Sequence, residues 1–171
     1  MKIGILGGTF NPIHLGHIRL AEEALEKFEL DKVIFIPTYI PPHKINKDII
    51  SFQNRYKMVE LAIEEKSNFE VSDLEVKLKG ISYSVNTIKE LKKIYDDTTN
   101  IYFVVGSDYA EELGLWKDIE DLKKLCKFAI ITRLGNISST NIRKLIRERK
   151  PFKNLLPQKV YDYILMNKLY K

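Results

Sequence analysis

Short apolar runs alternate along the chain with longer segments in which apolar residues recur every three to four positions. The apolar runs predict buried strands at residues 2–6, 33–36, 101–105 and 128–132. The periodic segments predict helices over residues 18–28, 52–66, 85–95, 119–125, 139–149 and 158–168. Residues 69–78 alternate in their second half, at Leu74, Val76 and Leu78, which predicts a half-exposed strand or an extended loop.

This alternation of strands and helices predicts an α/β fold in one domain that spans residues 1–171. We expect an open, doubly wound parallel sheet of the Rossmann-like type. In such sheets a ligand binds beyond the carboxyl ends of the strands. The Gly-, Pro- and His-rich loops of this chain all fall at that edge.

Composition narrows the class of protein. The 171 residues are 44% hydrophobic and 30% charged, so the chain can bury a core. The net charge of +5 is scattered, which suits an anionic small molecule and not nucleic acid. One cysteine excludes a disulfide framework, and three histidines with that thiol disfavour a structural zinc site. We found neither a signal-peptide pattern nor a long apolar run, so we expect a cytoplasmic protein with no membrane segment.

A glycine- and histidine-rich loop follows the first predicted strand, where a helix N-terminus can hold a phosphate. Its sequence is G-G-T-F-N-P-I-H-L-G-H, and neither the dinucleotide fingerprint nor the P-loop fits it. His14 and His17 share one face of the helix start and can donate hydrogen bonds to phosphate oxygens. The alternatives are a plain turn or half of a metal site, for which His43 is the one remaining histidine.

A second candidate loop, I-S-S-T-N-I-R at residues 137–143, precedes a predicted helix. Serine and threonine there are ordinary N-cap residues. Arg143, however, lies one turn into the helix, where a cation opposes the helix dipole unless an anion occupies the N-terminus.

The two loops together closely resemble the nucleotidylyltransferase superfamily, with its (H/T)-x-G-H and I-S-S-T-x-x-R motifs. The form G-G-T-F-N-P-I-H and the run Pro41-Pro42-His43-Lys44 resemble the bacterial nicotinate-nucleotide adenylyltransferases. This resemblance spans nearly the whole chain. It implies transfer of the adenylyl group of ATP to nicotinate mononucleotide, with Mg²⁺, giving nicotinate adenine dinucleotide and pyrophosphate in NAD biosynthesis.

The resemblance also implies roles for individual residues, but no resident metal site. The residues implied in catalysis are His14, His17, Lys44 and Arg143. Those implied in ATP binding are Gly7, Gly8, Thr9, Phe10, Gly16, Gly106, Asp108, Ile137, Ser138, Ser139, Thr140 and Arg143. Those implied in acceptor binding are Asn11, Lys44, Tyr83, Ser84, Trp116, Lys117 and Arg133.

Some positions remain open. A single tryptophan more often packs in the core than contacts a ligand. Trp116, however, precedes a predicted helix and is not on a core stripe. It resembles the family's tryptophan that stacks on the nicotinate ring. Asn86 replaces a common aspartate and could loosen its loop. Arg55 and Arg133 resemble family arginines, with surface solvation as the alternative. Cys126 lies beside Leu125 and Leu122 on a predicted helix and is interpreted as a small core residue.

The chain departs from the family between residues 133 and 137. Only Leu134, Gly135 and Asn136 lie there, whereas the family has a longer interval that normally contains another strand. Three residues span about 10–11 Å at most. Either the sheet lacks its sixth strand, or the sequence omits a segment.

Other functions remain to be weighed. A related adenylyl- or cytidylyltransferase could use another phosphorylated acceptor, such as phosphopantetheine. A non-catalytic nucleotide-binding regulator is disfavoured by the intact histidine pair, and an RNA-binding module by the lack of clustered basic and aromatic residues. We expect small-molecule partners, no nucleic acid, and a monomer or small homo-oligomer.

Overall fold

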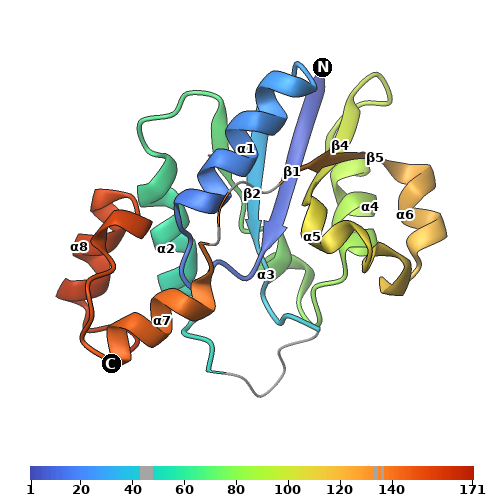
Figure 1. The fold of residues 1–171 in the computed structure, drawn as a ribbon. Coiled ribbons are helices and arrows are strands. Elements are labelled where there is room, and N and C mark those ends of the chain that lie inside the picture. The colour runs from blue at the N-terminus through green and yellow to red at the C-terminus, as the bar shows by residue number, and fades with distance from the viewer. Residues whose placement is uncertain (43–47, 133–134, 136) are drawn as a thin grey trace.

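The computed structural model describes residues 1–42, 48–132, 135 and 137–171. Five parallel strands form one sheet in the order β3-β2-β1-β4-β5 (Figure 1). The strands are β1 (Lys2–Gly8), β2 (Lys32–Pro37), β3 (Phe69–Val71), β4 (Asn100–Gly106) and β5 (Lys127–Ile131). This is the predicted α/β architecture. Strands β1, β2, β4 and β5 overlap the four predicted apolar runs, and β3 covers the beginning of segment 69–78, which was predicted as a half-exposed strand or an extended loop.

Helices connect successive strands and close the chain. They are α1 (Leu15–Lys27), α2 (Phe52–Ile63), α3 (Leu74–Leu78), α4 (Ser84–Ile94), α5 (Ser107–Ala110), α6 (Ile119–Leu125), α7 (Ser139–Arg147) and α8 (Gln158–Met166). Two 3₁₀ turns, η1 (Leu113–Leu115) and η2 (Lys153–Leu155), precede α6 and α8. Among the described residues, no helix is long and apolar enough to cross a membrane.

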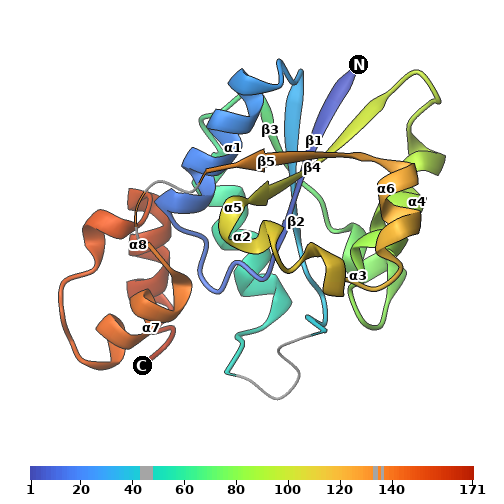
Figure 2. The ribbon, with the colours of Figure 1, turned by 45° about the vertical axis from the view of Figure 1, so that its right-hand side comes forward.

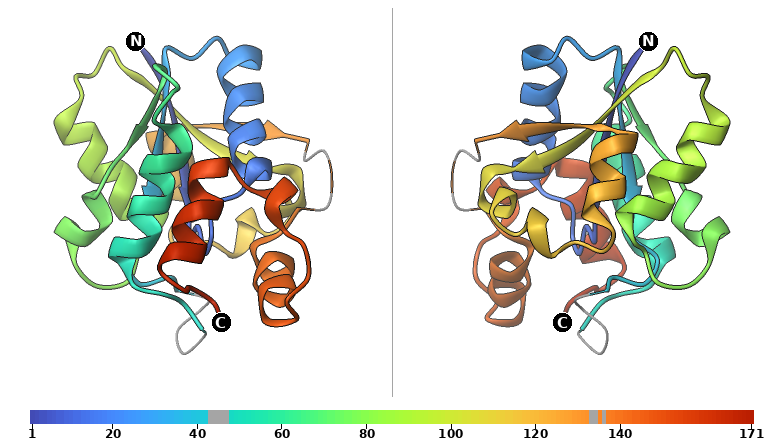
Figure 3. Two further views of the ribbon diagram at one scale, coloured as in Figure 1. Left: turned by 90° about the vertical axis from the view of Figure 1, so that its left-hand side faces the viewer. Right: turned by 90° about the vertical axis from the view of Figure 1, so that its right-hand side faces the viewer.

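Side chains that alternate along the strands build a core on each face of the sheet, because successive strand residues point to opposite faces. Val33, Phe35 and Val104 pack with α1, α2, α7 and α8 on one face. Ile34 and Phe103 pack with α3, α4 and α6 on the other. Figures 2 and 3 show the two helical layers on either side of the sheet.

The winding changes face between β1 and β4, which lie side by side at the centre of the sheet. Helix α1 leaves β1 on one face, whereas α6 follows β4 on the other. The loops at the carboxyl ends of these two strands therefore diverge, and this is where open parallel sheets of this type bind ligands. Both predicted nucleotide loops lie at this edge.

Two predictions about the elements need correction or refinement. Residues 74–78 form helix α3, not a strand, because Leu74 and Glu75 are both buried and the segment turns back onto the sheet. Cys126 follows α6 as its C-cap and does not lie within the helix, although it is buried as predicted. In the described part of the chain, β5 leads to α7 with no sixth strand between them.

Candidate active site

The first loop leaves β1 and enters α1 in a closely packed conformation. Phe10 is buried and has a φ of 48°, in the left-handed region. A Cβ on Gly8 would lie 3.0 Å from the Phe10 ring, and one on Gly16 would lie 3.0 Å from His14 Nδ1. These two glycines therefore allow the loop to fold tightly around the phenylalanine and the first histidine.

The two histidines of this loop stack on each other, with ring centroids 3.7 Å apart and an angle of 27° between the planes. The backbone N–H of His14 donates to His17 Nδ1 at 3.2 Å. Because Nδ1 accepts, Nε2 carries the proton of a neutral His17. His14 is 1% exposed, whereas His17 is partly exposed, so His17 is the histidine better placed to meet a ligand.

The second loop is tied directly to the first. Ser138 caps α7, since its Oγ accepts from the backbone N–H of Asn141 at 3.1 Å. The Oγ of Ser139 donates to the backbone oxygen of Pro12 at 2.8 Å, across 127 positions of sequence. The two motifs therefore lie in direct contact in the structure.

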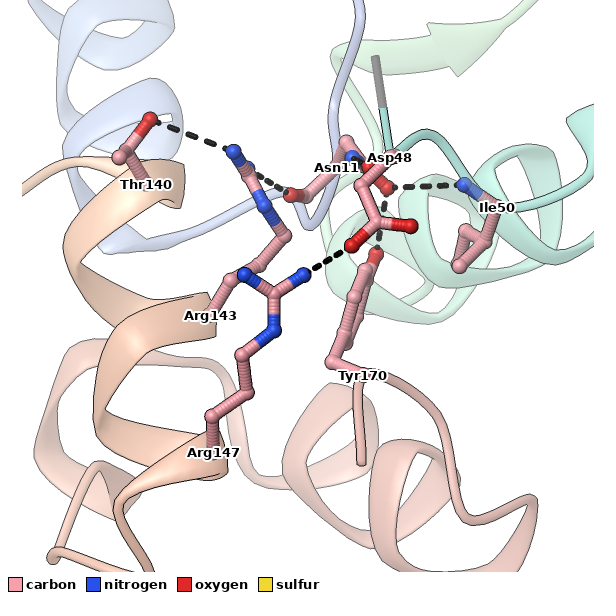
Figure 4. A network of polar contacts seen from close by, with 7 residues as sticks. All are labelled: Asn11, Asp48, Ile50, Thr140, Arg143, Arg147 and Tyr170. Carbon is pink, nitrogen blue, oxygen red and sulfur yellow. Dashed lines mark hydrogen bonds and ion pairs between the residues drawn. The ribbon is translucent and has the colours of Figure 1, made fainter.

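Arg143 crosses between the loops (Figure 4). Its Nη1 donates to the backbone oxygen of Asn11 at 2.7 Å, and its Nη2 donates to Thr140 Oγ1 at 3.3 Å. Partial burial lowers the pKa of this guanidinium from its usual range. Even so, a guanidinium stays charged at neutral pH, so a cation stands where the N-terminus of α7 meets the first loop.

Arg55 of α2 contacts the same loop. From the sequence, a solvated position on the surface is the alternative for this residue. The side chain is 1% exposed, and its Nη1 donates to the backbone oxygen of Thr9 at 2.8 Å. Its Nε donates to the backbone oxygen of Ile50 at 3.2 Å. Burial lowers the pKa of Arg55 to about 10. The alternative of a solvated surface arginine is wrong, because Arg55 is buried and its hydrogen bonds hold the first loop.

The predicted acceptor segments also come together. Lys117 Nζ lies 4.4 Å from the centre of the Tyr83 ring, which joins two segments more than 30 positions apart. Trp116 packs edge-on against Phe103 at 5.5 Å and belongs to the rim of the core, contrary to the expectation that it lies off the core. Ser84 is the first residue of α4, so its backbone N–H has no acceptor within the helix.

The end of β4 adds a carboxylate to the same edge of the sheet. A Cβ on Gly106 would lie 2.5 Å from Asp108 Oδ1, so only glycine lets this carboxylate fold back over the strand end. Within the described ranges, no group of three His, Cys, Asp or Glu side chains could hold a metal ion.

Some predicted residues lie outside the part of the chain that the structure describes, namely His43, Lys44, Arg133, Leu134 and Asn136. Other residues contact the first loop or lie beside it but were missed by sequence reasoning. Tyr170 and Asp48 both reach Asn11, and Arg147 forms an ion pair with Asp48 (Figure 4). Nothing in the local sequence marks them, because their partners are distant in the chain.

A parallel sheet with a histidine loop and a serine–threonine–arginine loop joined at its carboxyl edge defines a nucleotidyltransferase. The model of the family described as "Cytidylyltransferase-like" matches residues 5–145 of the chain. The chain belongs to this cytidylyltransferase-like family, and within it to the group of the nicotinate-nucleotide adenylyltransferases.

Two relatives illustrate this group, and both carry provisional names as nicotinate-nucleotide adenylyltransferases. The protein of Clostridium botulinum strain Langeland is 42% identical over 197 aligned positions, which cover 98% of each chain. The protein of Thermoanaerobacter sp. strain X514 is 38% identical over 200 positions, which cover 100% of this chain and 95% of the relative.

Solved structures share the fold. A crystal structure from Vibrio parahaemolyticus, provisionally named a nicotinate-nucleotide adenylyltransferase, is 26% identical and superposes with a TM-score of 0.84 over 99% of this chain and 94% of its own. The nicotinic acid mononucleotide adenylyltransferase of Plasmodium falciparum, solved with NaAD, is 20% identical with a TM-score of 0.80 over 99% and 97%.

The relatives are longer than this chain. The alignment with the Clostridium botulinum protein has 197 positions against 171 residues here, so at least 26 positions have no counterpart in this sequence. In the structure, residues 132–138 alone connect β5 to α7. This is the place where the sequence predicts a shortened interval.

Proposed function

We propose that this protein transfers the adenylyl group of ATP to nicotinate mononucleotide and releases pyrophosphate, a step in NAD biosynthesis. The observation that carries the proposal is the junction of the two loops. Ser139 is bonded to Pro12, and Arg143 to Asn11, so the histidine loop and the arginine helix face one place at the centre of the sheet. The kinship with adenylyltransferases supports ATP as the nucleotide.

The reaction needs positioning and charge neutralisation more than acid–base chemistry. A phosphate oxygen of nicotinate mononucleotide attacks the α-phosphorus of ATP, and the bond from that phosphorus to the β-phosphate oxygen breaks. The attacking oxygen is already ionised at neutral pH, so no general base is required. His17 Nε2–H would donate a hydrogen bond to a phosphate oxygen, and the Arg143 guanidinium and the Lys44 ammonium would neutralise phosphate charge.

Mg²⁺ fits this site as a companion of ATP. When bound with ATP, Mg²⁺ would supply further screening of the phosphate charge. Asp108, which Gly106 allows to fold over the end of β4, is the described carboxylate in reach of this edge.

The acceptor ring would lie between the Tyr83–Ser84 and Trp116–Lys117 segments. The indole offers an apolar face, and the backbone N–H groups of Ser84 and Lys117 offer donors to a ring carboxylate. A carboxylate accepts hydrogen bonds from both N–H groups. In nicotinamide mononucleotide the amide NH₂ is itself a donor, so it would face one of these N–H groups without forming a hydrogen bond. We expect kcat/KM to favour the acid over the amide by about 10²–10⁴.

The test measures pyrophosphate release with ATP and a panel of acceptors: nicotinate mononucleotide, its amide and phosphopantetheine. Equal use of acid and amide would remove the carboxylate pocket from the proposal. Preference for phosphopantetheine would assign the chain a different acceptor.

We further propose that the protein works in the cytoplasm, as a monomer or a small homo-oligomer. Its single cysteine, Cys126, is buried, and burial raises the pKa of its thiol to about 11. A protonated, enclosed thiol resists oxidation and has no partner within the chain for a disulfide.

A further inference from the structure

Asn11 is the point at which three other parts of the chain contact the first loop, through four hydrogen bonds. It is 4% exposed. Its Nδ2 donates to the backbone oxygen of Asp48 at 3.0 Å, and its Oδ1 accepts from the backbone N–H of Ile50 at 3.4 Å. Its backbone oxygen accepts from Arg143 at 2.7 Å, and its Oδ1 also accepts from the hydroxyl of Tyr170 at 3.0 Å. The orientation of this amide is therefore set by its neighbours (Figure 4).

Tyr170 reaches this position from the C-terminal end of the described chain, 159 positions away in sequence. The side chain is 8% exposed, and its hydroxyl has to donate, because an amide oxygen only accepts. Burial raises the pKa of this hydroxyl well above its usual range, against the opposing charges of Arg143 and Arg55. The phenol therefore stays protonated and remains a donor throughout the pH range of an enzyme.

The backbone beyond α8 is bent to bring Tyr170 inward. Lys168 has a φ of 52° and Tyr170 a φ of 65°, and the N–H of Leu169 donates to the backbone oxygen of Ile164 at 3.0 Å. Left-handed conformations are unfavourable for residues other than glycine. Two of them within three residues persist only where other contacts hold them, and the burial of Tyr170 against Asn11 is such a contact.

We propose that Tyr170 is a positioning residue for adenylyl transfer: by donating to Asn11 Oδ1, it holds the first loop where the Asn11 carbonyl can fix the Arg143 guanidinium. This inference rests on the proposed function of the site. Tyr170 touches no substrate in this scheme and acts through Asn11. Its effect is on the alignment of the histidine loop with α7.

The chain offers a matched control on the same C-terminal segment. The hydroxyl of Tyr163 in α8 donates to Asn54 Oδ1 at 2.8 Å, so it makes the same chemical contact, but to α2 and away from the loop. Tyr170→Phe and Tyr163→Phe each delete one hydroxyl and keep the ring. We expect similar losses of thermal stability from both substitutions.

Steady-state kinetics then separate positioning from folding. In Tyr170→Phe we expect kcat/KM for ATP to fall about tenfold, chiefly through a higher KM, because a shifted loop releases Arg143. Tyr163→Phe should stay within about twofold of the wild type. A purely structural role would lower the active fraction and hence kcat, but not change KM. A kcat-only loss, or equal kinetics in the two variants, would overturn the proposal.

A second measurement is independent of activity. Amide hydrogen exchange of residues 7–17 should accelerate in Tyr170→Phe and not in Tyr163→Phe, measured well below both unfolding temperatures. Unchanged exchange in this loop would contradict the positioning role even if the kinetics changed. A wild type that transfers nothing to nicotinate mononucleotide would contradict the proposed function alone, and the exchange comparison would still decide the role of Tyr170.

Discussion

The proposed nucleotide half and the proposed acceptor half of the site are built in different ways. The proposed nucleotide half is formed by the first loop, whose residues 10–14 are buried, and by the partly exposed start of α7. Hydrogen bonds such as Ser139 to Pro12 and Arg143 to Asn11 join the two. The proposed acceptor half consists of partly exposed Tyr83 and Trp116 and exposed Lys117, and Lys117 Nζ lies over the Tyr83 ring between its two segments.

This difference follows from what each half has to recognise. Charge on a transferring phosphate is stabilised best by donors that are already in place, because they need not reorganise during reaction. A flat ring is recognised by stacking, which tolerates small movements of an exposed side chain. We therefore expect substitutions in the nucleotide half to affect catalysis and folding, and those in the acceptor half to affect acceptor binding.

The largest expected effect tests the nucleotide half at His17. His17→Ala should fold normally and lose about 10²–10³ in kcat, because one donor to the transition state is gone. His17→Asn keeps an acceptor for the His14 backbone N–H but lacks a donor at the Nε2 position. Its kcat should therefore be as low as that of His17→Ala. His17→Gln, whose amide can reach that position, should recover part of the rate. Turnover of His17→Ala like that of the wild type would remove the histidine from the mechanism.

Arg55 tests whether the nucleotide half is also a folding element. Arg55→Met should lower the free energy of unfolding by about 3 kcal/mol, since the buried backbone oxygens of Thr9 and Ile50 lose their donors. Arg19→Met removes an exposed arginine of α1 and should change it by less than about 0.5 kcal/mol. Denaturant unfolding of both variants measures the difference. Equal stability would contradict the role of Arg55 as a clamp.

Arg143 tests ground-state binding of ATP. Arg143→Ala should raise KM for ATP about tenfold or more, because a charge-assisted hydrogen bond to phosphate is lost. Arg147→Ala, one turn further along α7, removes the same charge from an exposed ion pair with Asp48 and should change KM by about twofold at most. Similar KM values in both variants would mean that α7 attracts ATP only through general charge.

The smallest expected effect lies in the acceptor half. Trp116→Ala should weaken both the acid and the amide acceptor by about tenfold and leave their ratio nearly unchanged, because stacking does not distinguish the two groups. Trp116→Phe should recover most of the loss. Leu115→Ala, at an exposed neighbouring position, serves as the control. A changed ratio in Trp116→Ala would mean that the indole also positions the carboxylate donors.

Local sequence was sufficient for most elements but ambiguous for the shortest. Leu74 and Leu78 are four residues apart, and positions four apart share a face in a strand as well as in a helix. The spacing of apolar residues therefore could not distinguish the two in so short a segment. The burial of Glu75 beside Leu74, which decided for a helix, depends on what packs over it.

The amino-acid sequence by itself determined the order of strands and helices and the two motifs of the proposed nucleotide site, because the patterns and motifs consist of residues close together in the chain. Only the tertiary structure decided what holds those loops. Arg55 meets Thr9 across 46 positions, and Tyr170 meets Asn11 across 159. Such contacts carry no local pattern, since an arginine on a helix and a tyrosine near the chain end look like surface residues until folding removes them from water.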